Sequence, residues 1–429
     1  ITNSTFVANA GGSAGAILGD GALTLANSIV WGNSGDEIVT YSDITSIRNL
    51  LGVDPGFVRN PSDGGDGWID DLSTTTVDEA FNNDYGDLHL TERSPAIDYG
   101  EASQLPPDTH DLDHDGVSEE PIPVDREGNS RVFGQAVDCG AVELQRDIFP
   151  GRETPSVVVT TASDAFDLFD GQIALRESLY YAGTNSLGLT VTFAPALDGG
   201  TIALGGTMLW LDKPITIDAS SLNSLTVDAD GKSRVLRVAA SDAVLNSLTI
   251  TGGDADRGGG IYSTGSLTIR NGTLSDNSAT GWGGGIVSYG TLSVTDSRFS
   301  NNSSGSYGGA IFGSGTLSVT NSTLSDNSAV VYGGGIYGSG TVSVLDSTLL
   351  NNKSTTGFGG GIYGSGTFSM TNSTVSGNSS KSNGGGVYHS SGKLSVANST
   401  FSNNSSGNYG GAIHSAGTLS VAGSTLSGN

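Results

Sequence analysis

The C-terminal part of the chain repeats one pattern of apolar and polar positions every 25 or 26 residues from residue 258 onward. Three apolar columns and one asparagine column keep their register through seven successive units. The first column follows a glycine run and comprises Ile261, Ile286, Ile311, Ile336, Ile362, Val387 and Ile413. The second comprises Leu267, Leu292, Leu317, Val342, Phe368, Leu394 and Leu419. The third comprises Leu274, Phe299, Leu324, Leu349, Val375, Phe401 and Leu426. The asparagines are Asn277, Asn302, Asn327, Asn352, Asn378, Asn404 and Asn429.

Each unit contains short segments with the period of a β-strand. In residues 291–295, Thr-Leu-Ser-Val-Thr, apolar and polar side chains alternate, which predicts a strand with one buried face. Gly-rich and Asn/Ser-rich segments between the strands predict corners, and a repeat of this length indicates a solenoid. The sequence therefore predicts an all-β fold, a right-handed parallel β-helix with about 25 residues and three short strands per coil. A leucine-rich repeat has a similar period, but it needs more leucines per unit and a helical segment that these units lack.

The repeated polar and aromatic positions favour structural roles. We interpret the asparagine column as an internal ladder of side-chain amides, in preference to an exposed row of ligands. Aromatic residues near the corners are expected to stack on one another, although such rings also stack on sugars. They are Trp282, Tyr307, Tyr332, Phe358 and Tyr409. The Thr/Ser triplets 291/293/295, 316/318/320 and 367/369/371 should face outward as rows of hydroxyls, which suit a solvated face or contact with glycans or ice.

Four segments follow from these patterns. Residues 3–9 resemble residues 398–404, so 1–33 are expected to form the last coils of a first β-helix. Residues 34–149 form an acidic, irregular closing segment, 150–190 a linker and cap, and 191–429 a second β-helix, incomplete at its C-terminus. Within the cap, Asp170 is expected to start a short helix, with Leu175 and Leu179 on one face and Gly183 at its end. The chain begins and ends in the same phase of the repeat, so we expect one unit of a longer tandem array.

Composition and charge restrict the partners. The net charge of −26 argues against nucleic acid and anionic membranes, which require a positive surface. Residues 36–147 contain 26 Asp and Glu but only 6 Lys and Arg, so most of the excess negative charge lies in the closing segment. The single cysteine, Cys139, excludes an intrachain disulfide and is expected to be a small buried residue. No apolar stretch approaches the roughly 20 residues of a membrane-spanning helix.

Two acidic loops are candidate calcium sites. In the first, Asp111, Asp113 and Asp115 alternate before Gly116, as in the first half of a calcium-binding loop. Ile122 occupies the twelfth position, so Glu119 or Glu120 would supply the later carboxylate. A solvated acidic loop is the alternative. The second loop is spaced by glycines and offers Asp63, Asp66, Asp70 and Asp71. Structural Ca²⁺ would let this acidic segment fold compactly.

An enzyme is not expected. Glycoside chemistry needs paired carboxylates or a cation with a base on one face. The aspartates of the regular coils occupy two different corner positions, and the five histidines form no motif with a nucleophile. The corner aspartates are Asp276, Asp296, Asp326 and Asp346. The alternative function is a carbohydrate-binding or polysaccharide-cleaving β-helix.

Three segments resemble known families of bacterial surface proteins. Residues 299–302, Phe-Ser-Asn-Asn, and 308–311, Gly-Gly-Ala-Ile, resemble the repeats of chlamydial-type polymorphic outer-membrane proteins. Residues 157–164 and 173–178 resemble the CSLREA domain that opens many surface β-helices, with Ile173 and Ser178 in place of its Cys and Ala. Residues 86–90, 94–98, 123–125, 131–132 and 137–143 resemble the choice-of-anchor Q region that closes them.

These resemblances imply an extracellular or cell-surface protein of a Gram-negative bacterium and no reaction. Together with the repeat they predict a structural or adhesive scaffold, one unit of a tandem array that forms a stalk or fibre. The expected partners are neighbouring modules of the same chain or fibre and host, cell-surface or matrix glycans.

Overall fold

The computed structural model describes residues 1–9, 15–19, 22–33, 38–40, 44–55, 57–59, 87–91, 94–97, 99–107, 121–126, 130–132, 137–142, 153–183, 187–239 and 242–429. The chain divides into two compact units. Unit 1 contains residues 1–154 and 166–172, and unit 2 contains residues 155–165 and 173–429.

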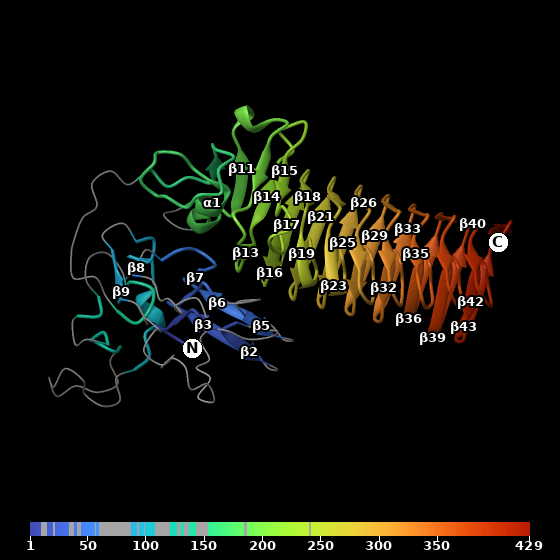
Figure 1. The fold of residues 1–429 in the computed structure, drawn as a ribbon, viewed down its shortest axis with the longest axis horizontal. Coiled ribbons are helices and arrows are strands. Elements are labelled where there is room, and N and C mark those ends of the chain that lie inside the picture. The colour runs from blue at the N-terminus through green and yellow to red at the C-terminus, as the bar shows by residue number, and fades with distance from the viewer. Residues whose placement is uncertain are drawn as a thin grey trace, which may run out of the picture. The chain divides into compact units, whose positions relative to one another are not determined.

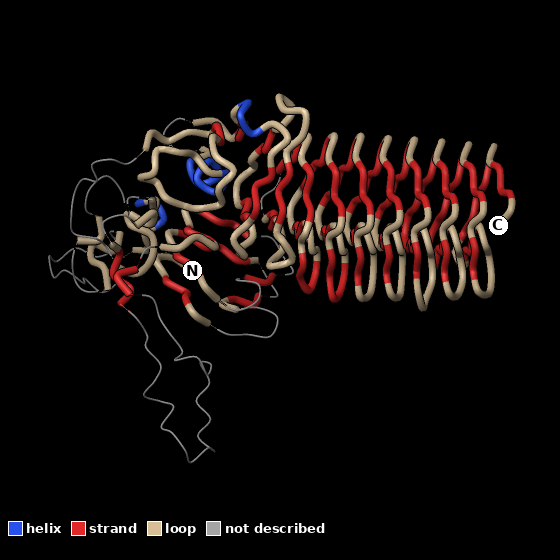
Figure 2. Tube along the Cα trace, turned by 45° about the horizontal axis from the view of Figure 1, so that its top comes forward, coloured by secondary structure: helices blue, strands red, loops and turns tan. Residues whose placement is uncertain are grey.

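Unit 2 is a stack of coils in which three parallel sheets run along the stack (Figure 1; Figure 2). Each regular coil contributes two strand positions to an 18-stranded sheet, one to a 10-stranded sheet and one to a 7-stranded sheet. Strands of equivalent position pair in parallel with the strands of the coils before and after them. Leu267 pairs with Leu292, for example, and Leu292 pairs with Leu317. The predicted parallel β-helix with about 25 residues per coil is therefore confirmed.

The strands of unit 2 recur in a fixed order along each coil. The first position holds β13 (Leu209–Leu211), β16 (Leu236–Val238), β20 (Ile261–Ser263), β24 (Ile286–Ser288), β28 (Ile311–Gly313), β32 (Ile336–Gly338) and β42 (Ile413–Ser415). The second holds β11 (Thr190–Phe193), β14 (Thr216–Asp218), β17 (Ala243–Asn246), β21 (Leu267–Arg270), β25 (Thr291–Thr295), β29 (Thr316–Thr320), β33 (Thr341–Leu345) and β43 (Thr418–Ala422). Two long strands span both positions, and one short strand completes this sheet: β36 (Ile362–Thr371), β39 (Val387–Ala397) and β10 (Val158–Val159).

The other two sheets complete each coil. The 10-stranded sheet holds β12 (Thr201–Ala203), β15 (Thr226–Asp228), β18 (Thr249–Thr251), β22 (Thr273–Ser275), β26 (Arg298–Ser300), β30 (Thr323–Ser325), β34 (Thr348–Leu350), β37 (Thr374–Ser376), β40 (Thr400–Ser402) and β44 (Thr425–Ser427). The 7-stranded sheet holds β19 (Asp254–Arg257), β23 (Ser278–Trp282), β27 (Ser303–Ser304), β31 (Ser328–Ala329), β35 (Lys353–Ser354), β38 (Ser379–Ser380) and β41 (Ser405–Ser406).

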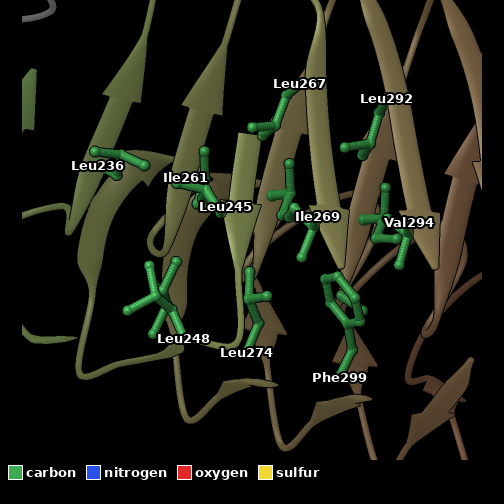
Figure 3. Packing of buried hydrophobic residues seen from close by; sticks show 14 of the residues in the cluster. Leu236, Leu245, Leu248, Ile261, Leu267, Ile269, Leu274, Leu292, Val294 and Phe299 are labelled. Atoms are coloured by element: carbon green, nitrogen blue, oxygen red, sulfur yellow. The ribbon is translucent and has the colours of Figure 1, made fainter. Parts of the chain in front are cut away.

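The apolar columns of the sequence form one continuous core inside the coils (Figure 3). Ile261 pairs with Ile286, and the two side chains are fully buried. Leu274 and Phe299 do the same in the 10-stranded sheet. Full burial of such a side chain contributes roughly 1.5–3 kcal/mol, so each added coil extends the core by several such contributions.

The corners are formed by glycine and by residues that tolerate the left-handed backbone. Gly308 has φ +68°, and a Cβ on the following Gly309 would lie 2.2 Å from the carbonyl oxygen of Gly334. From β22 to β34, both ends of each strand in the 10-stranded sheet carry Asn or Asp with positive φ, such as Asp296 at 51° and Asn301 at 57°. Asn and Asp adopt this conformation more readily than other non-glycine residues.

A short helix covers the first coils of unit 2. Helix α1 (Leu175–Tyr181) places Leu175 and Leu179 in the core cluster, as predicted. Beside Leu175, an apolar cavity of about 10 Å³ is too small for a ligand. The helix ends before Gly183, which has φ +73°. The predicted N-cap is wrong: the cap is Ala174, whose backbone N–H donates to the Glu177 carboxylate over 2.6 Å, whereas Asp170 accepts a hydrogen bond from the backbone of Gln172.

Arg176 fastens α1 to the coils. Its guanidinium forms a two-pronged ion pair with Asp164, with N–O distances of 2.7 and 3.0 Å, and both side chains are nearly inaccessible to solvent. The same guanidinium donates to the carbonyls of Thr207 and Met208, which directly precede β13. Asp164 also accepts from the backbone N–H of Gly205 over 2.8 Å.

Unit 1 contains coils of the same type. Strands β1 (Thr5–Val7), β4 (Ile29–Trp31) and β7 (Leu50–Leu51) form a parallel sheet. Two further parallel pairs accompany it, β2 (Ile17–Gly19) with β5 (Ile38–Thr40) and β3 (Leu23–Ala26) with β6 (Ile44–Ile47). The coils therefore extend past residue 33, as far as β7. The antiparallel pair of β8 (Phe57–Arg59) with β9 (Asp87–Leu90) follows, and the chain has 3₁₀ turns at Ala102–Gln104 and Pro195–Leu197.

The described part of the closing segment packs against the coils of unit 1. The side chain of Asn27 donates to the carbonyl of Glu101 and accepts from its backbone N–H. The buried Cys139 thiol lies 2.9 Å from the carbonyl of Arg48. These contacts show that the segment around Cys139 covers the coils directly.

Candidate functional surface

The predicted calcium ligands lie outside the described residues. This holds for all eight: Asp63, Asp66, Asp70, Asp71, Asp111, Asp113, Asp115 and Glu119. In the part of the chain that the structure describes, no group of three His, Cys, Asp or Glu side chains could hold a metal ion. The calcium sites therefore stay predictions.

The most regular chemical feature of unit 2 is a double row of aromatic rings, here called the aromatic ladder. Its first row lies at the corner before the first strand position: Trp282, Tyr307, Tyr332, Phe358 and Tyr409. Its second row is the middle residue of the first strand position: Tyr262, Val287, Phe312, Tyr337, Tyr363, Tyr388 and His414. The sequence predicted the first row and its self-stacking, which is confirmed for Trp282, Tyr307, Tyr332 and Phe358, whereas the ring of Tyr409 contacts His414. The second row was not predicted.

The rings of the ladder stack face to face along the coils and across the two rows. Within the second row, Tyr337 and Tyr363 have centroids 5.0 Å apart and planes within 4°. Across the rows, Tyr332 and Tyr363 lie 4.6 Å apart. Offset stacking at such distances is the favoured geometry for aromatic pairs. Because each ring covers its neighbour, the inner rungs turn their edges and not their faces toward the solvent.

Arginines replace rings where the ladder approaches α1. The guanidinium of Arg237 is fully buried between the rings of Trp210 and Tyr262, 4.8 and 4.9 Å from their centroids. Arg257 lies 4.4 Å from the ring of Trp282 in the first row. A guanidinium in this position is attracted by the ring quadrupole, and the interaction contributes about 2 kcal/mol when the pair is desolvated. The cations therefore continue the stack where the aromatic rings stop.

Burial shifts the ionisation of the ladder phenols. Desolvation raises the pKa of Tyr332, Tyr337 and Tyr388 above the usual value of a phenol. Tyr289, which packs on Tyr262 and Phe312, has its pKa raised furthest, again mainly by desolvation. The phenols of Tyr332, Tyr337 and Tyr388 are therefore uncharged at neutral pH.

The predicted hydroxyl rows form one face of the 18-stranded sheet. In β25, Leu292 and Val294 are fully buried, and Thr291, Ser293 and Thr295 alternate with them on the outer face. The rows are in register with the next coil, where Thr291 pairs with Thr316. Other residue types interrupt the rows, at Arg270, Leu345, Lys393 and Ala397.

The asparagine column is the predicted internal ladder. The side chain of Asn302 donates to Oδ1 of Asn327 over 2.9 Å and to the carbonyl of Leu274 over 2.9 Å. Its own Oδ1 accepts from both the backbone and the side chain of Asn277. The buried amide thus satisfies the corner backbone in the regular coils from Asn277 onward.

Sequence reasoning missed a second ladder, made of serines. The hydroxyl of Ser322 accepts from the backbone N–H of Ser297 over 3.1 Å and donates to the carbonyl of Thr320 over 2.7 Å. The same bonds recur at Ser347, Ser373, Ser399 and Ser424. The detectable signal was a serine five residues before six of the seven asparagines of the column, all except Asn277. Unit 1 repeats both ladders in its first coils, from Asn9 to Asn33 and from Ser4 to Ser28.

The exposed corners alternate between Asp and Asn in two columns that flank the 10-stranded sheet. One column reads Asn271, Asp296, Asn321, Asp346, Asn372, and the other reads Asp276, Asn301, Asp326, Asn351. Three of the amides donate to the carboxylate of the preceding coil: Asn321 to Asp296, Asn351 to Asp326 over 3.3 Å and Asn372 to Asp346 over 3.0 Å. Asn271 donates instead to the amide oxygen of Asn246 over 3.1 Å. The predicted separation of the coil aspartates into two corner positions is confirmed.

One histidine lies inside the coils. His389 is fully buried at a position that Ser or Gly occupies in the other coils, and its ring contacts the Gly366 carbonyl at 3.3 Å and the Ser415 hydroxyl at 3.4 Å. Desolvation lowers the pKa of its imidazole, against the opposing effect of the Gly366 carbonyl. His389 is therefore neutral in the folded coils.

Among the described residues, no helix is long and apolar enough to cross a membrane. The family model for the Chlamydia polymorphic membrane protein (Chlamydia_PMP) repeat matches residues 296–314 and 398–416. No curated protein and no solved structure matches the chain.

The two matched stretches share features that the other regular coils lack. Each has phenylalanine in the third apolar column, Phe299 or Phe401, and Gly-Gly-Ala where the other coils have Gly-Gly-Gly. Both phenylalanines are fully buried, and the alanines, Ala310 and Ala412, lie in the same core cluster. In its repeat, the chain is similar to the polymorphic membrane proteins; the likeness of residues 157–178 to the CSLREA domain and of residues 86–143 to the choice-of-anchor Q region stays a prediction.

Proposed function

We propose that this chain is an extracellular structural or adhesive scaffold and not an enzyme. The observation that carries the proposal is the continuity of the amide, serine and aromatic ladders from coil to coil. Each coil uses its polar and aromatic groups on its neighbours, so these groups stiffen the stack instead of forming an open site. A rod of this kind holds its shape without disulfides.

We propose further that the chain is one unit of a tandem array that forms a surface stalk or fibre. Support comes from the two coil stacks in one chain, which use the same Asn and Ser ladders and are separated in the sequence by the closing segment. Electron microscopy of the native cell surface, with an antibody against unit 2, tests this proposal. Fibres with regularly spaced label are expected, and label dispersed on a smooth surface or only inside cells would contradict it.

The proposed location is the surface of a Gram-negative bacterium, with neighbouring modules and host, cell-surface or matrix glycans as partners. The match to the polymorphic membrane protein repeat supports this location. Protease treatment of intact cells provides the check, because a surface protein is cleaved while a cytoplasmic control protein survives.

The second candidate is a carbohydrate-binding or polysaccharide-cleaving β-helix. The hydroxyl rows of β25 and β29 favour it, because they form a flat, in-register face that could meet a repeating polymer. A glycan array tests binding, a reducing-sugar assay tests cleavage, and a thermal-hysteresis measurement tests ice. Negative results in all three leave the scaffold. The stacked rings of the ladder support the scaffold, since a sugar cannot stack on a face that another ring already covers.

We also propose that structural Ca²⁺ binds the two acidic loops of the closing segment. The alternating carboxylates at Asp111, Asp113 and Asp115 support it. Chelation is the corresponding test and is set out in the Discussion.

A further inference from the structure

The aromatic ladder brings tyrosines of successive coils into direct ring contact. Five such contacts join half-buried tyrosines, and the centroid distances run from 4.6 to 5.3 Å. They are Tyr307–Tyr332, Tyr307–Tyr337, Tyr332–Tyr363, Tyr337–Tyr363 and Tyr363–Tyr388. Each contact links two different coils.

Phenols in this arrangement are suited to oxidative coupling. Removal of one electron and one proton from a tyrosine gives a phenoxyl radical. Its unpaired electron is delocalised onto ring carbons that include the two ortho to the phenolic oxygen. When two neighbouring rungs are oxidised, the two radicals are held on rings whose centroids lie 4.6–5.3 Å apart. The stack therefore favours coupling between these two rings over coupling with a ring of another molecule.

We propose that the aromatic ladder is a site of dityrosine cross-linking that joins consecutive coils covalently, with Tyr363 as its central residue. The co-reactant is a one-electron oxidant, such as the one a peroxidase forms from hydrogen peroxide. Two ring C–H bonds break and one C–C bond forms between the rings. Two electrons go to two equivalents of oxidant and two protons go to water, so the linked chain is lighter by two hydrogen atoms. The inference is independent of the surface role.

Tyr363 is central because it takes part in three of these five contacts, with Tyr332, Tyr337 and Tyr388. Tyr409 provides the contrast. It is 69% exposed, and its ring contact is with His414 at 6.3 Å and not with another tyrosine. If exposure governed the reaction, Tyr409 would react first and join separate molecules. If ring contact governs it, Tyr363 reacts within one molecule.

The test uses the folded chain at low concentration with a photogenerated one-electron oxidant. Trypsin cleaves after Arg298, Lys353 and Lys381, so Tyr363 is the one tyrosine of peptide 354–381, whereas Tyr332 and Tyr337 lie in peptide 299–353. Cross-linked pairs of these two peptides are expected, with dityrosine fluorescence and with the protein still monomeric on a denaturing gel.

Two matched variants decide the result. Tyr363→Phe keeps the stack, because phenylalanine already occupies the rungs at Phe312 and Phe358. It should lower the intramolecular yield by more than half, whereas Tyr409→Phe should leave the yield unchanged. In denaturant the preference for Tyr363 should vanish. Cross-links that are mainly intermolecular or that involve Tyr409, or a yield insensitive to Tyr363→Phe in the folded protein, would overturn the inference.

Discussion

Asn302 and Asn327 join two coils through a hydrogen bond of 2.9 Å, which the side-chain amide of Asn302 donates to Oδ1 of Asn327. The same Oδ1 also accepts the backbone N–H of Asn302 over 3.0 Å. Asn327 in turn donates to the carbonyl of Phe299. One buried side chain thus satisfies three polar groups of the preceding coils.

Asn327→Ala is expected to lower the free energy of unfolding by about 3 kcal/mol or more, because each buried group left unsatisfied costs about 1–3 kcal/mol. Chemical denaturation followed by circular dichroism measures the loss. The matched control is Asn321→Gly, since Asn321 is exposed and its φ of 46° suits glycine. The ladder would have no energetic role if both variants unfolded at the same denaturant concentration.

The Arg176–Asp164 ion pair gives a second prediction. Arg176→Met leaves the buried Asp164 carboxylate without its cation, and breaking a buried pair in this way costs about 3–5 kcal/mol. The first coils should open, with a lower melting temperature and new protease cleavage near residues 205–208. The double variant Arg176→Met/Asp164→Asn should recover part of the loss. Equal melting of the wild type and Arg176→Met would show that α1 is not fastened by this pair.

His389 predicts a loss of stability in acid. Burial lowers the pKa of its imidazole in the folded state below the ordinary 6.5 of the unfolded chain. As the pH falls below 6.5, the unfolded state therefore binds a proton at this imidazole before the folded state does, and the free energy of unfolding decreases. His389→Ser, which restores the residue found at Ser263 and Ser288, should flatten this dependence between pH 6.5 and 5. Parallel pH profiles of the two proteins would argue against it.

The ladder tyrosines predict a matching effect in alkali. Burial raises the pKa of Tyr337 and Tyr332 in the folded state, so above about pH 10 the unfolded chain loses protons first and stability declines. Tyr337→Phe should reduce this decline and change neutral-pH stability by less than about 1 kcal/mol. Tyr337→Ala should cost about 2 kcal/mol, less than the 3–5 kcal/mol of a fully buried ring. Melting curves at pH 7 and pH 11 separate these effects.

Calcium removal tests the acidic loops. With Ca²⁺ bound, chelation should leave mutually repelling carboxylates around Asp111, Asp113 and Asp115, and the closing segment should become the first part of the chain to be cleaved by protease. Asp113→Asn should reproduce the effect without chelator, and calorimetric titration with Ca²⁺ measures binding directly. If chelator changes neither melting nor cleavage, the loops are solvated and bind no structural metal.

The coils could be predicted because their periodicity reports burial directly. In the first six units, every aliphatic of a column, such as Leu292, is buried like its equivalents, so sequence position translates into structure. The second row of the aromatic ladder escaped prediction because Tyr337 and Tyr363 each follow a buried isoleucine at the start of a strand, and a single residue after an apolar position does not reveal what it packs on. The coil strands of residues 38–51 were missed because their repeat is shorter and keeps too few of the column residues.

The alternation of Asp and Asn at the corners makes the chemical repeat two coils long, although the backbone repeat is one. Removal of the single coil that carries Asn321 would place Asp296 and Asp346 on adjacent corners. At the strand spacing of about 4.8 Å their charges would repel. Removal or duplication of two coils keeps every carboxylate beside an amide. We therefore expect length variants of this rod to differ by even numbers of coils in the stretch from Asn271 to Asn351, a rule that gene sequences from related strains can test.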